Sequence, residues 1–292
     1  MSKPKPRSRW SCLRAYLPLL AAPLLMAPKL SAIADTNKVS RVARPATVPF
    51  AQSSKEVQSA APDMTQQLVQ IDPLDSPHPI PWNWVMTTHA DVTAKGASGL
   101  RYYRSQSLVS PDGQYAAYTR IQMDVQPELY RSRVTSVMFL ENLKTGDLRT
   151  ITASSPLADN PLAANEEADM PGTIAILIPI SWSPDGDRIL ARQFEGLFST
   201  SDASDYAVIW DRKLNRTSTV APDRSQYSTA VLLGWSRTNP GRVLFRAGEL
   251  GEENWPLWAV DINGQTIAAT EDKPAVFGQR VNNVWAGPQA RW

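Results

Sequence analysis

The chain has 292 residues, of which 42% are hydrophobic and 20% are charged, a balance typical of a soluble protein with a folded core. Its 24 prolines, 14 glycines and 10 tryptophans favour a loop-rich β-protein and exclude a coiled coil, a fibre and a multi-pass membrane protein. The formal net charge is +2, but residues 1–34 contain six basic residues and no acidic ones. The remainder has 24 basic and 28 acidic side chains, so its charge does not favour nucleic-acid binding.

Residues 1–34 have the three parts of a secretory signal peptide. A basic stretch precedes an apolar run at residues 15–28, and the small residues Ala32 and Ala34 fit a cleavage site before Asp35. The run has about 14 residues, whereas a membrane helix needs ~20. We expect export to the periplasm or cell envelope without a stable membrane span after cleavage; an uncleaved anchor is the alternative. The only cysteine precedes the apolar run, so the mature chain needs no disulfide and has no thiol for catalysis.

Residues 35–81 are predicted to be a disordered tether. They are rich in Ala, Ser, Gln, Thr and Pro and nearly free of aromatic residues, so they cannot bury enough surface to offset their ordering entropy. The last part is dense in proline and is expected to be extended. Asp72, Asp75 and His78 are spaced by three there, but an extended backbone does not bring them together, so we predict no metal site. The folded domain is expected to span residues 82–292.

Three stretches of this domain repeat one pattern, in which an apolar strand, a tight turn and a second apolar strand follow each other. Proline presets φ at the second position of such a turn, aspartate bonds its own backbone, and glycine takes the left-handed position. This chemistry predicts β-hairpins. The turn residues are Pro111, Asp112 and Gly113 in the first stretch, Pro184, Asp185 and Gly186 in the second, and Pro240 and Gly241 in the third.

A second hairpin is expected after each of these, which gives units of four antiparallel strands, the unit of a β-propeller blade. The predicted fold is all-β and propeller-like, with about three complete blades and a partial fourth that begins at residues 284–292. Strands near residues 82–88 and 100–107 would complete the fourth blade with the C-terminal strand. Alternatively the propeller stays open, and its unpaired edge would allow a homodimer or a partner strand. Residues 153–173 are expected to be an inserted acidic surface loop.

The Ser-Pro-Asp-Gly turns at Ser110–Gly113 and Ser183–Gly186, each followed by a short apolar strand, resemble the WD-like propeller repeats of the TolB family. The resemblance covers roughly residues 100–292. It implies a β-propeller, export to the periplasm, a role in protein–protein interaction and no catalysis. The N-terminal α/β domain of that family has no counterpart here, because residues 35–100 are too polar and rich in proline. The resemblance therefore implies fold and compartment but assigns no binding residues.

The tryptophans divide into two groups. Recurrence at fixed repeat positions predicts packing between blades, and the residues that recur are Trp182, Trp210, Trp235, Trp258 and Trp285. Non-recurrent tryptophans are better candidates for a ligand or partner surface, and these are Trp82, Trp84, Trp255 and Trp292.

The expected function is scaffolding: a non-enzymatic module that binds a partner protein in the cell envelope, with no cofactor or metal. A glycan- or peptide-binding propeller that uses the non-recurrent tryptophans is the first alternative. A hydrolase is the second, because propellers do host active sites. It would depend on His78 or His89, the only histidines, and the sequence has no nucleophile elbow.

Overall fold

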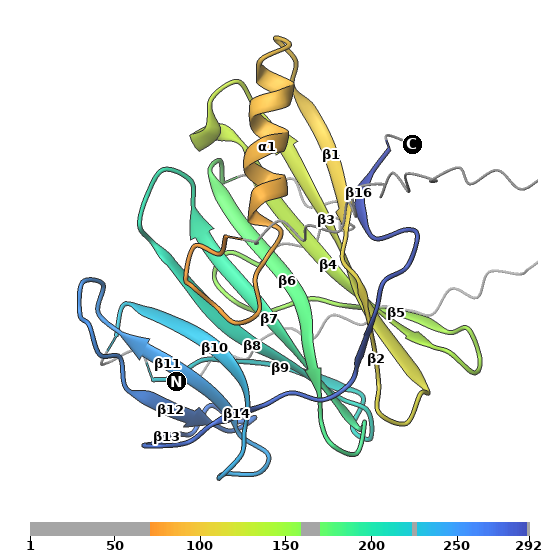
Figure 1. The fold of residues 1–292 in the computed structure, drawn as a ribbon, viewed down its shortest axis with the longest axis vertical. Helices are drawn as coiled ribbons and strands as arrows, with labels where there is room; N and C mark the ends of the chain where they lie inside the picture. The colour runs from red at the N-terminus through yellow and green to blue at the C-terminus, as the bar shows by residue number, and fades with distance from the viewer. Residues whose placement is uncertain (1–70, 159–169, 224–226, 291–292) are drawn as a thin grey trace, which may run out of the picture. The chain divides into compact units, whose positions relative to one another are not determined.

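The computed structural model describes residues 71–158, 170–223 and 227–290. Regular structure in these ranges is almost entirely β-strand, and α1 (Trp82–Thr93) is their one α-helix (Figure 1). The all-β class is therefore confirmed. No helix in the same ranges is long and apolar enough to cross a membrane. The predicted signal peptide, most of the predicted tether and Trp292 lie outside the described residues.

Three units of four antiparallel strands follow one another along the chain, and all six predicted hairpins are present. The first unit consists of β2 (Ser107–Val109), β3 (Tyr115–Val125), β4 (Arg133–Asn142) and β5 (Leu148–Ile151), with a short 3-10 helix (Leu129–Arg131) before β4. The second consists of β6 (Thr173–Trp182), β7 (Arg188–Leu197), β8 (Ala203–Asp211) and β9 (Arg216–Val220). The third consists of β10 (Thr229–Ser236), β11 (Val243–Gly248), β12 (Leu257–Val260) and β13 (Thr266–Ala268).

The first two units join into one 11-stranded sheet, because β4 and β6 meet in a short parallel contact between Val134 and Ile174. The third unit lies in a separate five-stranded sheet. All ten residues of β6 are buried, since one face packs on the large core with Val85 and Val92 of α1 and the other on a second core around Trp182. Backbone pairing therefore joins the first unit to the second, but no strand of the second unit pairs with a strand of the third.

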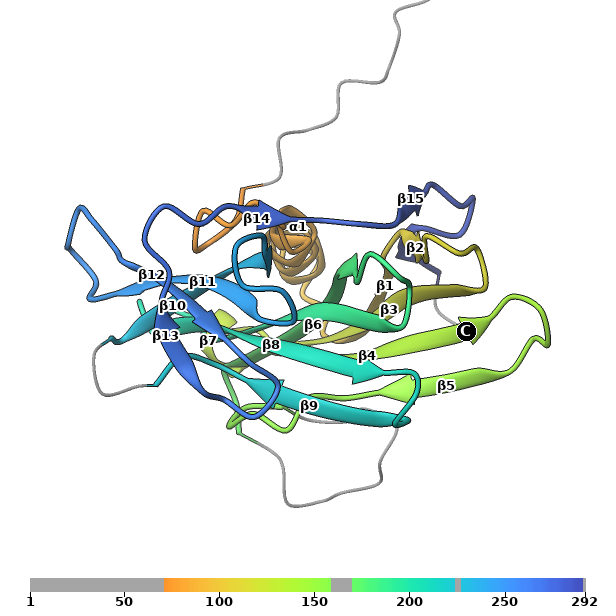
Figure 2. The same ribbon diagram turned by 90° about the horizontal axis from the view of Figure 1, so that it is seen from below.

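The segment 274–289, which we call the strap, ties the three units together. It contains β14 (Pro274–Ala275), β15 (Gln279–Val281) and β16 (Gly287–Gln289). β14 pairs with β10 and β15 pairs with β2, while the backbone N–H of Trp182 at the end of β6 donates to the Phe277 carbonyl at 2.9 Å. Figure 2 shows the strap running from β14 to β15. It therefore contacts the first strand of every unit.

Residues 82–88 were predicted to be a strand, and this prediction was wrong. They begin α1 directly after Pro81, and the helix buries Val85 and Val92, which lie seven residues apart on one helical face. The strand predicted near Leu100 is β1 (Gly99–Arg104), and it does pair with the C-terminal strand β16. It pairs with β3 as well, so it extends the first sheet and does not begin a fourth unit.

Residues 71–81 were assigned to the disordered tether, but they are packed against the domain. The fully buried guanidinium of Arg192 on β7 donates to both carboxylate oxygens of Asp72 at 2.6 and 3.1 Å and to the His78 carbonyl at 2.7 Å. It also donates to buried Asp205 on β8 at 2.8 Å. The Nε2–H of His78 donates to the Leu233 carbonyl at 3.0 Å. The folded domain therefore includes residues 71–81, since this polar network fixes a segment that has few apolar side chains.

The ionisable groups of this network are strongly perturbed. Burial raises the pKa of Asp205 to about 6, although the positive charge of Arg192 opposes the rise. Burial also acts to raise the pKa of Asp72, but the bonds from Arg192 and from the backbone N–H groups of Ile80 and Leu74 outweigh it and lower that pKa. Two buried carboxylates therefore share one guanidinium, and neither has another cation within bonding distance among the described residues.

The recurrent tryptophans were predicted to lie in the core, and Trp182, Trp210 and Trp235 do so, with Trp258 half-buried against it. Trp285 is a correction, because its side chain is 70% exposed. The sequence around Trp285 resembles the repeat pattern but does not form the repeat structure. The strand that follows, β16, has only three residues, and it pairs with β1 and forms no hairpin.

Candidate functional site

Each repeat turn is built around a serine hydroxyl that donates to a carboxylate. In the first turn Ser110 donates to Asp112 at 2.6 Å and accepts from the Tyr115 N–H, while Gly113 has φ of +67°. In the second turn Ser183 donates to Asp187 at 2.7 Å. The prediction that Asp185 caps this turn was therefore wrong, because the carboxylate two residues later takes the role and leaves Asp185 exposed.

The third turn has no aspartate of its own, and Asp272 supplies the carboxylate from outside it. Asp272 accepts from the Ser236 hydroxyl and from the backbone N–H groups of Arg237 and Thr238, each at 3.1 Å. Burial raises the pKa of Asp272, but the bonds from Ser236 and Thr238 outweigh this effect and hold the pKa well below its usual value. One aspartate therefore holds this turn against the segment that leads into the strap.

Replacing this carboxylate is expected to destabilise the protein in a pH-dependent way. Asp272→Asn should lower the free energy of unfolding by about 2–3 kcal/mol at pH 7, because buried donors lose a charged acceptor. The pKa of Asp272 is lower in the folded than in the unfolded protein, so its contribution is present above the unfolded pKa of about 3.9 and is lost as the pH falls toward the folded value.

Urea unfolding at pH 7 and pH 3 tests this sign, because the gap between wild type and variant should shrink at pH 3. Asp147→Asn is the control, since Asp147 is exposed and accepts from the Thr145 hydroxyl in the β4–β5 hairpin turn. An equal gap at both pH values would contradict the assignment.

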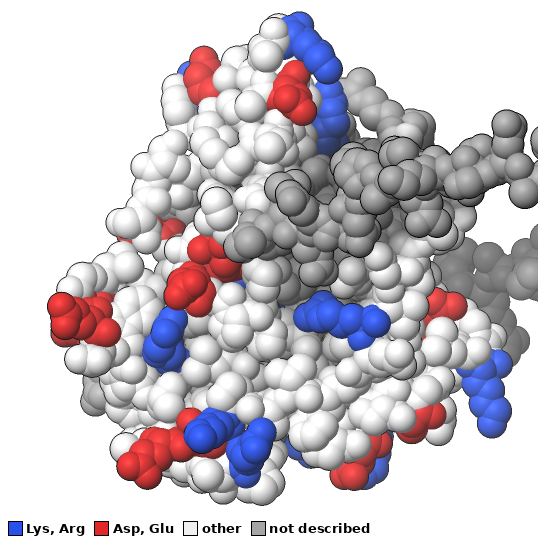
Figure 3. Space-filling model, viewed as in Figure 1, with Lys and Arg blue, Asp and Glu red and all other residues white. Residues whose placement is uncertain are grey.

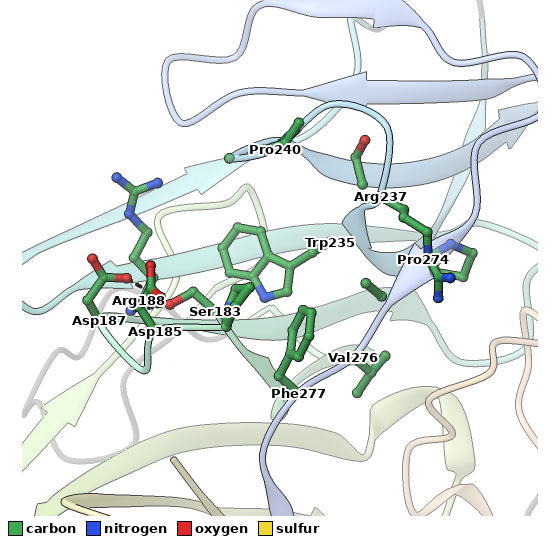
Figure 4. Close-up of a pocket in the computed structure, with 14 residues that line it drawn as sticks. Ser183, Asp185, Asp187, Arg188, Trp235, Arg237, Pro240, Pro274, Val276 and Phe277 are labelled. Atoms are coloured by element: carbon green, nitrogen blue, oxygen red, sulfur yellow. Dashed lines mark hydrogen bonds between the residues drawn. The ribbon is translucent and has the colours of Figure 1, made fainter. Parts of the chain in front are cut away.

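A pocket of about 710 Å³ opens between the second and third turns (Figure 4), and we call it the turn pocket. The first and second turns lie close together, since a Cβ on Gly186 would be 3.2 Å from the Asp112 carboxylate carbon, and Arg212 in the β8–β9 turn also donates to Asp112 at 2.9 Å. No such bond joins the second turn to the third among the described residues, and the strap forms the remaining wall. The lining residues are Ser183, Pro184, Asp185, Asp187, Arg188, Trp235, Ser236, Arg237, Pro240, Gly241, Pro274, Ala275, Val276 and Phe277.

The interior of the turn pocket is apolar, and charged side chains stand at its sides. Arg188 bonds Asp211 at 2.9 Å, and Lys213 lies 3.0 Å from Asp187. Bonds from Ser183 and from Lys213 lower the pKa of Asp187, so this carboxylate is ionised near neutral pH. Arg237 is exposed on the third turn, across from exposed Asp185 on the second. On the face seen in Figure 3 acidic and basic side chains are likewise interspersed.

The indole of Trp235 carries an unpaired donor at this pocket. Its side chain is 5% exposed, and its Nε1–H has no hydrogen-bond partner among the described residues. In Figure 4 the nitrogen edge of the ring faces Phe277 of the strap. An unpaired buried donor costs roughly 1–3 kcal/mol, and such a group in a folded protein calls for an explanation. The nitrogen itself has almost no accessible surface, so the protein covers this donor on the side of the pocket as well.

The structure does not gather the non-recurrent tryptophans into one surface. Trp82 stacks on Phe198 with ring centroids 6.1 Å apart, and Trp84 lies 5.2 Å from Tyr103. Trp255 donates to the Glu249 carbonyl at 3.0 Å. None of these three lines the turn pocket.

The other candidate residues also have structural contacts. His89, on α1, bonds the Gln126 carbonyl at 3.1 Å. Neither His78 nor His89 lines the turn pocket. The acidic loop is described only at its ends, where the Ser155 hydroxyl and the Leu157 N–H both donate to Glu195. No group of three or more possible metal-ligating side chains comes together within the described ranges.

The sequence identified part of this site and missed its centre. Pro184, Asp185, Pro240 and Gly241 were predicted as turn residues, and all four line the turn pocket. Trp235 was predicted as core because it recurs, and recurrence does not reveal whether its N–H is paired. The strap residues carry no motif, so no sequence signal could have placed them in the wall.

No family model matches the chain, and no curated protein matches it. Among solved structures it is similar to a glycosyl hydrolase from Bacteroides ovatus, with 8% sequence identity and a TM-score of 0.31. That alignment covers 66% of this chain and about half of the other one, 51%. At this level the likeness carries no argument about fold or activity.

Proposed function

We propose that this protein is an exported, non-enzymatic binding module with an incomplete β-propeller of the TolB kind, and that it binds a partner protein in the periplasm or cell envelope. The three four-stranded units would be its blades. The strap supports this arrangement, because one segment can pair with the first strands of three units only if those strands lie along a common edge.

The turn pocket is the proposed binding site. The observation that carries this proposal is the pocket of about 710 Å³ itself, which two repeat turns and the strap enclose. Ligand pockets typically enclose roughly 300–1,000 Å³ and combine apolar walls with a few polar groups that fix orientation. In proteins generally, binding residues concentrate on loops that a rigid scaffold positions, and the repeat turns at the edge of the turn pocket are loops of this kind.

Crosslinking from inside the pocket tests the proposal. Val276 is 52% exposed in the strap wall, so we would replace it with photoreactive p-benzoylphenylalanine and irradiate producing cells. The expected result is one discrete protein adduct in the periplasmic fraction that is lost when Arg237→Glu is added. The matched control places the same group at Leu214, which is 67% exposed in the β8–β9 turn and outside the pocket. The proposal fails if position 276 gives no adduct, or the same adducts as position 214.

A further inference from the structure

The two hydroxyl groups that line the turn pocket are committed to the protein. The Ser183 hydroxyl donates to Asp187 at 2.7 Å and accepts from the Arg188 N–H at 3.0 Å. The Ser236 hydroxyl donates to Asp272, which does not itself line the pocket. Neither hydroxyl therefore has a free proton to offer to a ligand, and the charged side chains have to supply the polar part of recognition.

Four charged side chains line the turn pocket, and two of them are balanced by neighbours at the second turn. Asp187 lies 3.0 Å from the ammonium nitrogen of Lys213. The Nε–H of Arg188 donates to Asp211 at 2.9 Å. Because each of these charges has an opposite charge beside it within the protein, neither gives the pocket a preference for one sign of ligand.

The other two charged side chains, Asp185 on the second turn and Arg237 on the third, are exposed. Neither side chain has a hydrogen bond or ion pair within the described residues. In Figure 4 they lie on opposite sides of the Trp235 ring. The turn pocket therefore has one negative and one positive side, and both charges are available to a partner.

The wall between these two charges is apolar and accessible. Pro240 on the third turn and Pro274 in the strap are exposed, Val276 is 52% exposed, and Phe277 is half-buried. Covering these groups with an apolar side chain removes apolar surface from water on both partners, which favours binding.

Opposite charges on the two sides discriminate between classes of ligand. A nucleic acid or an anionic lipid carries one sign of charge, so the attraction that it gains at Arg237 is opposed by repulsion at Asp185. A free amino acid carries both signs, but only a few bonds apart, whereas the two side chains stand on either side of an indole ring. An extended polypeptide can present both signs and an apolar side chain between them, because its alternate residues point to the same side.

We propose that the turn pocket binds a segment of a partner protein in which an apolar side chain stands between a basic and an acidic residue. The apolar side chain enters the pocket, the basic residue lies beside Asp185 and the acidic residue lies beside Arg237. This inference rests on the proposed binding function and names the chemistry of its partner. The backbone of the segment can run in either direction, so both signs of charge are required but not one order of them.

Four acetylated and amidated peptides on one framework test this chemistry with the full chain. Their sequences are Ser-Lys-Ser-Leu-Ser-Glu-Ser, Ser-Lys-Ser-Leu-Ser-Lys-Ser, Ser-Glu-Ser-Leu-Ser-Glu-Ser and Ser-Lys-Ser-Ser-Ser-Glu-Ser. Ligand-observed NMR at low salt, where exposed charges are least screened, measures their dissociation constants. We expect the first peptide to bind about 5-fold more tightly than the two peptides of one charge sign, and about 10-fold more tightly than the peptide without leucine.

Reversing a charge on the protein should change which peptide binds best. Asp185→Lys makes both sides positive and should favour the peptide with two glutamates, whereas Arg237→Glu makes both sides negative and should favour the peptide with two lysines. Both side chains are exposed, so we expect both variants to fold as the wild type does. The matched controls are Glu253→Lys and Lys144→Glu, which reverse exposed charges outside the pocket and should keep the wild-type preference.

Equal affinities of the three leucine peptides, or a preference that neither reversal changes, overturn the charge assignment. Equal binding of the peptide without leucine overturns the apolar anchor. If no peptide binds, the partner chemistry is wrong, and the crosslink at Val276 then separates the two proposals. A discrete adduct at position 276 leaves the binding function standing, whereas its absence overturns that function as well.

Discussion

Arg192→Met is expected to lower the free energy of unfolding by about 3–5 kcal/mol, the largest loss that we predict for a single charge. The substitution removes the cation shared by Asp72 and Asp205 and leaves two carboxylates in a site where the Arg192 side chain has no exposed surface. It also detaches residues 71–80, since the His78 carbonyl loses the same donor. Denaturant unfolding and hydrogen exchange at the Ile80 amide measure the two effects.

Two further variants separate charge burial from packing. Arg212→Met breaks an ion pair that is about one-third exposed and should cost less than about 1 kcal/mol. Adding Asp72→Asn and Asp205→Asn to Arg192→Met should recover part of the loss, because the buried charges are then gone. If Arg192→Met costs no more than Arg212→Met, the network does not hold the N-terminal segment.

Gly278→Ala is expected to cost about 3 kcal/mol and to displace the strap. Gly278 has φ of +99°, and a Cβ there would lie 2.8 Å from the Val109 carbonyl and 2.8 Å from Cδ1 of Trp182. The carbonyl belongs to the backbone of β2 and cannot turn aside, so the strap must move. Thermal unfolding measures the loss, and faster cleavage within residues 274–289 by a protease reports the displaced strap.

Gly264→Ala provides the control for backbone strain alone. Gly264 has a similar φ of +85°, but no atom lies within 4 Å of the Cβ position. This variant should therefore cost about 1 kcal/mol, the usual penalty for a left-handed residue with a side chain. Equal losses in the two variants would mean that the close approach of the strap to β2 and β6 contributes nothing.

The repeat units could be predicted because their hairpin turns are local. Proline, aspartate and glycine fix a tight turn within four residues, so the pattern at Ser110–Gly113 reports structure directly. The turn at Ser183 shows the limit, since either Asp185 or Asp187 could have bonded the serine and only the backbone path selects Asp187. The helix α1 was missed because Trp, Val and Thr at residues 82–88 have strand propensity, whereas packing of Val85 and Val92 selects the helix.

The candidate site could not be predicted as a site because it depends on distances between units. Nothing in the sequence distinguishes the paired indole of Trp182 from the unpaired indole of Trp235, and the difference arises from the gap between the two sheets. Arg192 likewise appears in the sequence as one arginine within an apolar strand. Its two acidic partners lie 13 and 120 residues away, so only the fold brings them together.

The strap also determines when the protein can finish folding. Phe277 bonds Ser181 across 96 residues of chain, and Asn283 bonds Ser107 across 176. The strap follows all three units in the chain, so the first strands of the units have open edges until it pairs with them. Closing such long loops is slow. A chain whose strap has not yet paired is therefore incompletely folded, and its open strands β2, β6 and β10 are then exposed to pairing with other chains.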